Sequence, residues 1–275
     1  MEIAMDDRAL IIQRDNQTSA VAADLHLGFH IELSETKKVT IPSQIENILQ
    51  RVLKFQEKYQ VNTLYLLGDV KHSILVDNEY NWQNIPDFME KLTDKIEVKI
   101  IPGNHDGNLE ALLPRNVELV DVRGMKIGHK PSIGLIHGHA WPSEEILESD
   151  ILIMGHSHPS IKRIKRVIST KAERDILRYG ESIPVILKSK IKKNCIRERM
   201  GLDSKTDDEN GTLIVLPAFN RLISGISINR TDNRLGGPFF ENDCVDIKST
   251  QVYSCNEIYL GTLLELQSRF SEMLK

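Results

Sequence analysis

Residues 98–106 read Val-Lys-Ile-Ile-Pro-Gly-Asn-His-Asp, an apolar run followed at once by side chains that bind metals or protons. A short apolar run closed by Pro-Gly is typical of a buried strand and its turn. Four other apolar runs end in the same way, in Asp-Leu-His (24–26), Gly-Asp (68–69), His-Gly-His (137–139) and Gly-His-Ser-His (155–158). Because the carboxyl ends of strands in an α/β sheet face one crevice, we expect these five turns to form one site.

Stretches with a helical pattern lie between the first three of these predicted strands. Apolar residues recur at helical spacing from Ile41 to Phe55, and Pro42 lies near the expected helix start. A weaker helical pattern covers Pro86–Lys95. Residues 117–122 and 125–136 instead follow each other as strands with no helix between them. This order predicts an α/β fold with a mixed sheet and is compatible with two sheets stacked face to face.

The pattern changes after His158. Residues 161–169 and 183–188 are expected to be strands, 189–210 a polar loop or small insertion, and 212–219 another strand. A helix is expected near the C-terminus, around Leu263–Met273. No stretch has the composition of a linker, so we expect a single domain over residues 1–275 with a basic elaboration at about 161–212.

Composition excludes several classes of protein. Of the 275 residues, 40% are hydrophobic and 27% charged, which is typical of globular proteins. No apolar stretch approaches the ~18 residues of a membrane span, and the N-terminus starts acidic, with no basic and apolar leader. Three widely spaced cysteines exclude a disulfide scaffold and a four-cysteine zinc site. We therefore expect a soluble cytoplasmic protein with no membrane partner.

The formal net charge of -4 hides an uneven distribution. Residues 161–200 contain 13 Lys and Arg against 4 Asp and Glu, a local net charge of +9, which leaves -13 for the rest. Such a block can attract a polyanion, so the segment 162–199 is a candidate contact for DNA or RNA. An ordinary solvated surface is the alternative, and the sequence leaves both open.

The five motifs, in this order, resemble those of the calcineurin-like metallophosphoesterase superfamily. Residues 68–72 (Gly-Asp-Val-Lys-His) and 216–220 (Leu-Pro-Ala-Phe-Asn) are similar to a narrower group, the archaeal phosphoesterases related to the SbcD nuclease subunit and the bacterial ligase-associated phosphoesterases. The resemblance implies a four-layer αββα sandwich, with two mixed β-sheets flanked by helices. It also implies a centre of two divalent metal ions in the crevice.

The resemblance further implies which residues bind these ions. The first metal would be held by Asp24, His26, Asp69 and His158. The second would be held by Asp69, Asn104, His137 and His156, so that the Asp69 carboxylate bridges both. His105 matches the acid–base histidine of the family, and His139 is expected to lie behind the ligands.

The chemistry of these residue types supports that assignment. Two divalent ions roughly 3.5–4 Å apart activate a water for in-line attack on phosphorus. Asn104 offers an amide oxygen to a metal and an NH2 group to substrate, while His105 is able to protonate the leaving oxygen. Asp106 is a candidate for fixing the tautomer of His105. The donor set favours Mn2+, although Fe2+, Zn2+ and Ni2+ also fit.

Two further histidines have alternative interpretations. His30 either faces the crevice or lies on the surface, and His72 is a candidate supporting residue because it follows Asp69 in the same turn. The function predicted first is a metal-dependent phosphodiesterase or nuclease acting on nucleic acid. A phosphatase or phosphodiesterase for a small nucleotide, and a non-catalytic assembly subunit, are the alternatives. The sequence leaves open the substrate, the native metal, endo- versus exo-cleavage and the oligomeric state.

Overall fold

The computed structural model describes residues 1–275 except 76–77, 170–173, 207–209 and 275, and the side chains of 164–179 and 274 are also outside the described part. Its strands form two mixed sheets. The six strands of the first sheet, in spatial order, are β1 (Glu2–Asp6), β2 (Ala9–Arg14), β3 (Gln17–Ala23), β4 (Thr63–Leu67), β5 (Glu97–Ile101) and β6 (Glu118–Leu119). The first three strands are antiparallel, and β3 to β6 are parallel.

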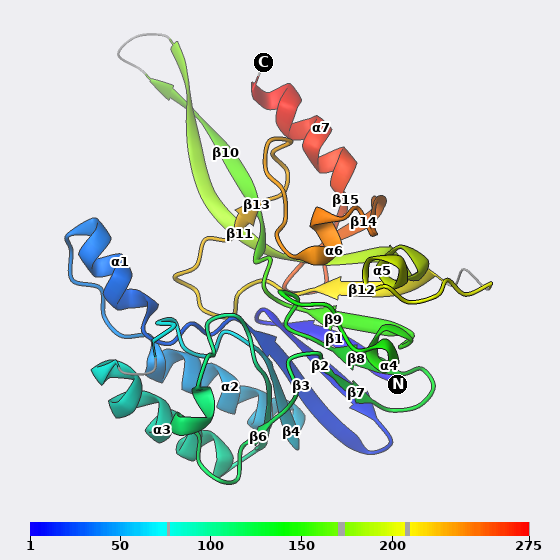
Figure 1. Ribbon diagram of the computed structural model, residues 1–275. Helices are drawn as coiled ribbons and strands as arrows, with labels where there is room; N and C mark the ends of the chain where they lie inside the picture. The colour runs from blue at the N-terminus through cyan, green and yellow to red at the C-terminus, as the bar shows by residue number, and fades with distance from the viewer. Residues whose placement is uncertain (76–77, 170–173, 207–209, 275) are drawn as a thin grey trace.

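The second sheet is larger. Its main path is β13 (Ile226–Ser227), β10 (Pro159–Ser169), β11 (Arg174–Lys192), β12 (Asn210–Val215), β9 (Ile151–Met154), β8 (Ile133–Leu135) and β7 (Met125–Ile127). β14 (Val245–Ser254) pairs with β11, and β15 (Tyr259–Thr262) pairs with β14. β10 and the first part of β11 form a long antiparallel hairpin that leaves the body of the molecule (Figure 1).

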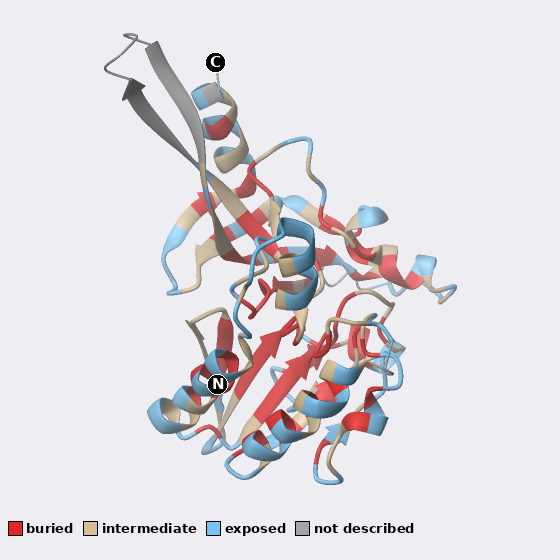
Figure 2. Cartoon of the chain, turned by 90° about the vertical axis from the view of Figure 1, so that its left-hand side faces the viewer, coloured by how far each residue is buried: buried red, intermediate tan, exposed pale blue. Residues whose placement is uncertain are grey.

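Helices cover the outer faces of both sheets (Figures 1 and 2). The first sheet is accompanied by α1 (Phe29–Lys37), α2 (Ile45–Tyr59), α3 (Glu79–Thr93) and the 3-10 helix η1 (Leu109–Leu112). The second is accompanied by α4 (Glu144–Leu147), α5 (Lys193–Arg199), α6 (Pro238–Glu241) and α7 (Leu263–Leu274). None of the described helices is long and apolar enough to cross a membrane.

Three apolar clusters hold these layers together. The apolar stripe of α2, which includes Ile48 and Val52, packs on the outer face of the first sheet. Between the sheets, Val21 of the first and Ile153 of the second belong to one buried apolar cluster. A third cluster joins the second sheet to its helices. Helix, sheet, sheet and helix therefore follow each other, and the predicted fold class is confirmed.

Several local predictions were wrong. The predicted loop 189–210 begins as strand, because β11 continues to Lys192 with β12 on one edge and β14 on the other. It then forms α5, whose Arg197 is buried in ion pairs with Glu144 and Glu148. The strand predicted over 212–219 ends at Val215, and α1 was not predicted at all.

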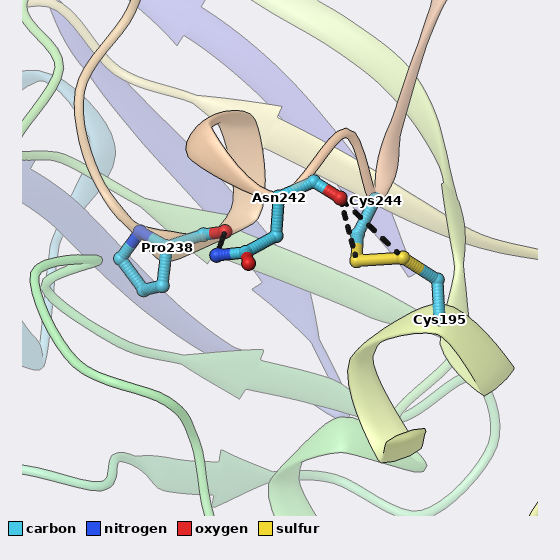
Figure 3. Close-up of a disulfide and its surroundings, with 4 residues drawn as sticks. All are labelled: Cys195, Pro238, Asn242 and Cys244. Carbon is cyan, nitrogen blue, oxygen red and sulfur yellow. Dashed lines mark hydrogen bonds between the residues drawn. A yellow bond between two sulfur atoms is a disulfide. The ribbon is translucent and has the colours of Figure 1, made fainter. Parts of the chain in front are cut away.

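A disulfide between Cys195 and Cys244 connects α5 to the start of β14 (Figure 3). The carbonyl oxygen of Asn242 lies 3.7 Å from Cys195 Sγ and 3.6 Å from Cys244 Sγ, and the Asn242 side chain donates a hydrogen bond to the Pro238 carbonyl. Cysteine spacing excluded a disulfide-rich scaffold, but it could not exclude this single bridge across 49 residues.

Candidate active site

The five predicted turns meet at the carboxyl ends of β3, β4, β5, β8 and β9. Their backbone is unusual, because five candidate ligands have positive φ angles: Asp24 (59°), His26 (40°), Asp69 (49°), His156 (64°) and His158 (41°). Such conformations are uncommon outside glycine and tend to cluster at functional sites. The strand ends thus turn each side chain into the crevice at some cost in backbone strain.

Glycines allow two of these turns to approach each other closely. A Cβ atom at Gly68 would lie 2.5 Å from His137 Nδ1, and one at Gly103 would lie 2.2 Å from Asp69 Oδ1. Both contacts are too short for any other residue. The Gly-Asp and Gly-Asn-His-Asp motifs therefore need their glycines to bring Asp69 and His137 together.

The first group of potential ligands consists of Asp24, His26 and His158, whose donor atoms all lie within 4.8 Å of one another. Asp24 is fully buried, and its Oδ1 lies 3.2 Å from His158 Nε2. The Asp24 carboxylate also accepts a hydrogen bond from the backbone N–H of His156 at 3.0 Å. The group thus joins the end of β3 to the turn after β9.

The second group consists of Asp69, His137 and His156, within the same distance limit. His137 is fully buried, and its Nδ1 donates to the Leu67 carbonyl at 2.7 Å, which leaves Nε2 free to coordinate. This Nε2 lies 3.3 Å from Asn104 Oδ1, so the amide oxygen of Asn104 faces the same point.

Asp69 lies between the two groups. Its Oδ2 is 3.5 Å from His26 Nε2 and 3.6 Å from His137 Nε2. Its Oδ1 accepts a hydrogen bond from the backbone N–H of His105 at 2.9 Å. One carboxylate oxygen thus faces both groups while the other fixes the loop that carries His105.

The donor atoms fit a pair of divalent ions. His26 Nε2 and His158 Nε2 are buried without a properly directed hydrogen-bond partner, although both face carboxylates. Burial lowers the pKa of His26 to about 3 and that of His156 to about 4, which keeps both rings in the neutral form that binds metals. Burial alone would raise the pKa of Asp24, but the His158 and His137 rings outweigh it and lower that pKa to about 2.

His105 lies beside both groups. Its ring packs edge-on against His26, with centroids 4.8 Å apart, and stacks on His72 at 5.5 Å. Its Nδ1 lies 2.5 Å from the backbone carbonyl of His72. Because a carbonyl only accepts hydrogen bonds, Nδ1 carries the hydrogen and Nε2 is the nitrogen that exchanges a proton.

Asp106 does not have the role suggested from the sequence. Its Oδ1 accepts from the backbone N–H of Val70 at 2.9 Å and of Lys71 at 3.3 Å, and its Oδ2 accepts from Gly103 at 2.9 Å. These bonds tie the turn after β4 to the turn after β5. The carbonyl of His72, rather than Asp106, sets the tautomer of His105.

The remaining histidines differ in their relation to the site. His72 faces His26, with the two Nδ1 atoms 3.4 Å apart, and pairs with Glu32 through Nε2 at 2.6 Å. His139 packs against His137 at 5.1 Å and has a buried Nδ1 without a partner. His30 belongs to neither ligand group and packs on the ring of Tyr80.

Two supporting residues were missed by the sequence analysis. Lys71 is fully buried, and its ammonium group donates to the carbonyls of Ser73, Ile74 and His105. Asn220 is buried too, and its amide donates to the carbonyls of Leu25 at 2.9 Å and His26 at 3.3 Å. Both lie in stretches that resemble the narrower group (68–72 and 216–220), but the sequence gave neither residue a role, because their partners are backbone atoms of turns formed only in the fold.

The basic segment 162–199 is not one surface. Lys188, Lys190 and Lys192 are exposed on the part of β11 that pairs with β12, whereas Lys193 and Arg197 are buried. β12 runs parallel to β9, and Lys192 pairs with Asn210 at its start. The candidate ligands follow the other end of β9, so Lys192 lies at the end of these strands away from the crevice, whereas Lys188 pairs with Ile214 near the crevice end of β12. The segment's basic residues among 164–179 have side chains outside the described part.

A two-sheet sandwich with adjoining Asp and His groups at its strand ends defines a metal-dependent hydrolase. The model of the calcineurin-like phosphoesterase family matches residues 18–189, more than half of the chain, and the protein belongs to this family. Members of the family use two metal ions, and the two groups of Asp and His residues fit that requirement. The chain is therefore an enzyme rather than a non-catalytic assembly subunit.

Three solved structures give more distant similarities. Nuclease MPE of Pseudomonas putida is 18% identical over 82% of this chain and 95% of its own, with a TM-score of 0.45. The phosphoesterase Yfce of E. coli is 18% identical over 54% and 73%, with a TM-score of 0.34. An archaeal phosphodiesterase is 12% identical over 59% and 99%, with a TM-score of 0.30. No curated protein matches the sequence. At these values the similarities do not identify the substrate of this chain.

Proposed function

We propose that the enzyme hydrolyses phosphodiester bonds of nucleic acid with two divalent ions held at the crevice. The proposed ligands are Asp24, His26, Asp69 and His158 for the first ion, and Asp69, Asn104, His137 and His156 for the second. The observation that carries this proposal is the position of Asp69 Oδ2, 3.5 Å from His26 Nε2 and 3.6 Å from His137 Nε2. A shared ligand has to face both sets of donors in this way.

The ions, when bound, supply an activated water nucleophile and neutralise the charge that develops on the phosphoryl oxygens. Imidazole nitrogens together with carboxylate and amide oxygens suit Mn2+, which we propose as the native metal. Fe2+, Zn2+ and Ni2+ fit the same donors, so metal content has to be measured.

The chain's own residues position the phosphate and move the proton. With its amide oxygen turned to His137, Asn104 has an NH2 group free to donate to a phosphoryl oxygen. His105 protonates the leaving oxygen from Nε2, since the His72 carbonyl holds its Nδ1. The hydrogen bond from the His105 backbone to Asp69 keeps this acid in register with the ligands.

The charge of the β10–β11 hairpin supports a polyanionic substrate. Residues 161–180 contain seven Lys and Arg against two Asp and Glu. β10 begins at Pro159, directly after the proposed metal ligand His158, so the hairpin that carries this charge starts beside the proposed metal site. Lys162 and Arg163, at the start of β10, are the described cations of this hairpin, and cationic side chains that contact a nucleic-acid backbone increase affinity for it.

A small nucleotide is the second candidate substrate. It is favoured by a pocket of about 420 Å3 beside His105, which is large enough for one nucleoside. A small diester would use this pocket and would not need the hairpin.

A substrate panel tests both candidates. Protein loaded with Mn2+ would be assayed with bis-p-nitrophenyl phosphate, p-nitrophenyl phosphate, cyclic nucleotides, and single- and double-stranded DNA and RNA. We expect faster hydrolysis of diesters than of monoesters, and cleavage of at least one polynucleotide. Hydrolysis confined to cyclic nucleotides would favour the second candidate, and hydrolysis confined to monoesters would contradict both.

A further inference from the structure

A pocket of about 420 Å3 opens next to His105. Its walls come from the turn before α1, from α1 itself, from residues 73–75 and from the start of α3, and His72 and His105 border it. If His105 protonates the leaving oxygen, the group attached to that oxygen has to lie on this side of the metals. The pocket is therefore placed to receive the leaving group.

Three large apolar side chains of the pocket wall are exposed to solvent. Leu75 is 73% exposed, Ile74 59% and Ile31 37%, and all three line the same pocket. The ring of Tyr80 forms another wall, held by edge contact with His30 at 5.3 Å. Several large apolar side chains exposed beside an active site typically indicate a surface that becomes covered by a ligand.

The charge of the pocket lining favours a neutral occupant over a phosphate. The described residues that line it include no Lys or Arg but two carboxylates, Glu32 and Glu35. Glu32 pairs with His72 at 2.6 Å, and the side-chain amide of Asn81 donates to the Leu75 carbonyl. A neutral group with a flat apolar face fits such walls, and an anion is repelled by them.

We propose that this pocket binds the nucleoside on the leaving side of the scissile phosphate, so that the preferred substrate has an unpaired nucleotide there. A base in a duplex is held by pairing and stacking, and it would have to leave the helix to enter a pocket of this size. Single strands and flaps present such a base without that cost. The proposal rests on the phosphodiesterase function proposed above and specifies its substrate class.

The test uses thymidylyl-thymidine, the dinucleoside monophosphate, and two analogues in which one or the other thymine is replaced by hydrogen at an abasic sugar. With Mn2+-loaded wild-type enzyme, removing the base on the leaving side is expected to lower kcat/KM about tenfold or more, the typical contribution of one stacked base. Removing the base on the other side is expected to have a smaller effect. Equal kcat/KM for all three substrates would overturn the proposal while leaving the phosphodiesterase function intact.

Leu75→Ser provides the matching change in the protein. At 73% exposure this side chain contributes little to folding, so the variant should remain folded. The ratio of kcat/KM between the intact and the abasic substrate is expected to fall towards one. Ile258→Ser is the control, because Ile258 is 62% exposed in the turn between β14 and β15 and does not line the pocket. An unchanged ratio in Leu75→Ser would overturn the proposal.

An error in the phosphodiesterase proposal can be distinguished from an error in the nucleoside-pocket proposal. If Mn2+-loaded enzyme hydrolyses none of the diesters, the phosphodiesterase proposal is wrong. Binding of free thymidine, measured by saturation-transfer NMR, then tests whether the pocket binds a nucleoside. A signal with wild type that weakens in Leu75→Ser but persists in Ile258→Ser would support a nucleoside pocket, and no signal with wild type would overturn it.

Discussion

The crevice and the segment from the second half of β11 into α5 show that closeness along the sequence and closeness in the fold are different things. The candidate ligands are spread from Asp24 to His158, yet they meet within a few ångströms. The basic residues from Lys188 to Arg197 are close in sequence, yet they divide into an exposed row on β11 and a buried pair in α5.

The difference arises from strand geometry. Residues that follow parallel strands are placed at one edge of the sheet, so Gly68-Asp69 and Gly103-Asn104 lie together because β4 and β5 are parallel neighbours. Lys188, Lys190 and Lys192 alternate along β11 and form one exposed row, whereas Lys193 and Arg197 belong to α5 and are buried, so the basic residues of this segment do not make one continuous patch. Position at a strand end predicts a shared site better than closeness along the chain.

The strongest test of the crevice is Asp69→Asn. We expect loss of detectable hydrolysis and a fall from two bound metals to one or none, because a neutral amide cannot supply two anionic contacts. Metal content would be measured by elemental analysis after dialysis, and folding by circular dichroism. A variant with two tightly bound metals and normal turnover would show that Asp69 does not bridge them.

His105→Ala separates proton transfer from metal binding. General acid catalysis contributes about 10²–10⁴-fold, so hydrolysis of a substrate with a poor leaving group should fall by that amount. The loss should be smaller with bis-p-nitrophenyl phosphate, whose p-nitrophenolate departs without a proton. Metal content should stay at the wild-type value, since His105 is not among the proposed ligands. Equal losses with both substrates would assign His105 to positioning instead.

Asn220→Ala tests whether distant segments support the crevice. This residue fixes the carbonyls of Leu25 and His26, so its loss should let the proposed ligand His26 move. Partners of metal ligands typically contribute 10–100-fold to metal affinity or activity, and we expect a loss of about tenfold in affinity. Competition with a fluorescent chelator would measure it.

Asn229→Ala is the matched control for that variant. Asn229 is also a buried asparagine bonded to backbone, but its partner is Lys162 in β10. An equal loss of metal affinity in both variants would mean that any buried asparagine affects the site through stability alone.

Most of the crevice could be predicted from the sequence, since its residues directly follow apolar strands. Its supports could not, because Lys71 and Asn220 act on backbone carbonyls that come together only when the turns fold. The extent of β11 was also hidden, since the polar residues after Lys188 become strand only between two partner strands. The disulfide depends likewise on the position of α5 beside the start of β14.

The smallest effect is expected from the exposed lysines of β11. Replacing Lys190 and Lys192 by Ala should leave polynucleotide affinity and its salt dependence unchanged, because these lysines pair with Thr212 and Asn210 at the start of β12, whereas the crevice follows the far end of β9. Asn210 to Val215 alone spans about 17 Å at the usual rise of a strand. Binding would be measured by fluorescence anisotropy at several salt concentrations.

A variant of the β10–β11 hairpin is the counterpart of the β11 lysine variant. Lys162 and Arg163 lie on β10, a few residues after His158, and neither side chain is buried. Replacing both by Ala should weaken polynucleotide binding and reduce the slope of log K against log salt by about 0.7–0.9 for each phosphate that the protein no longer neutralises. If the β11 variant changes the slope and the hairpin variant does not, nucleic acid binds at the end of β12 away from the metals. The hairpin would then have no part in substrate binding, and its charge would no longer support a polynucleotide substrate at the crevice.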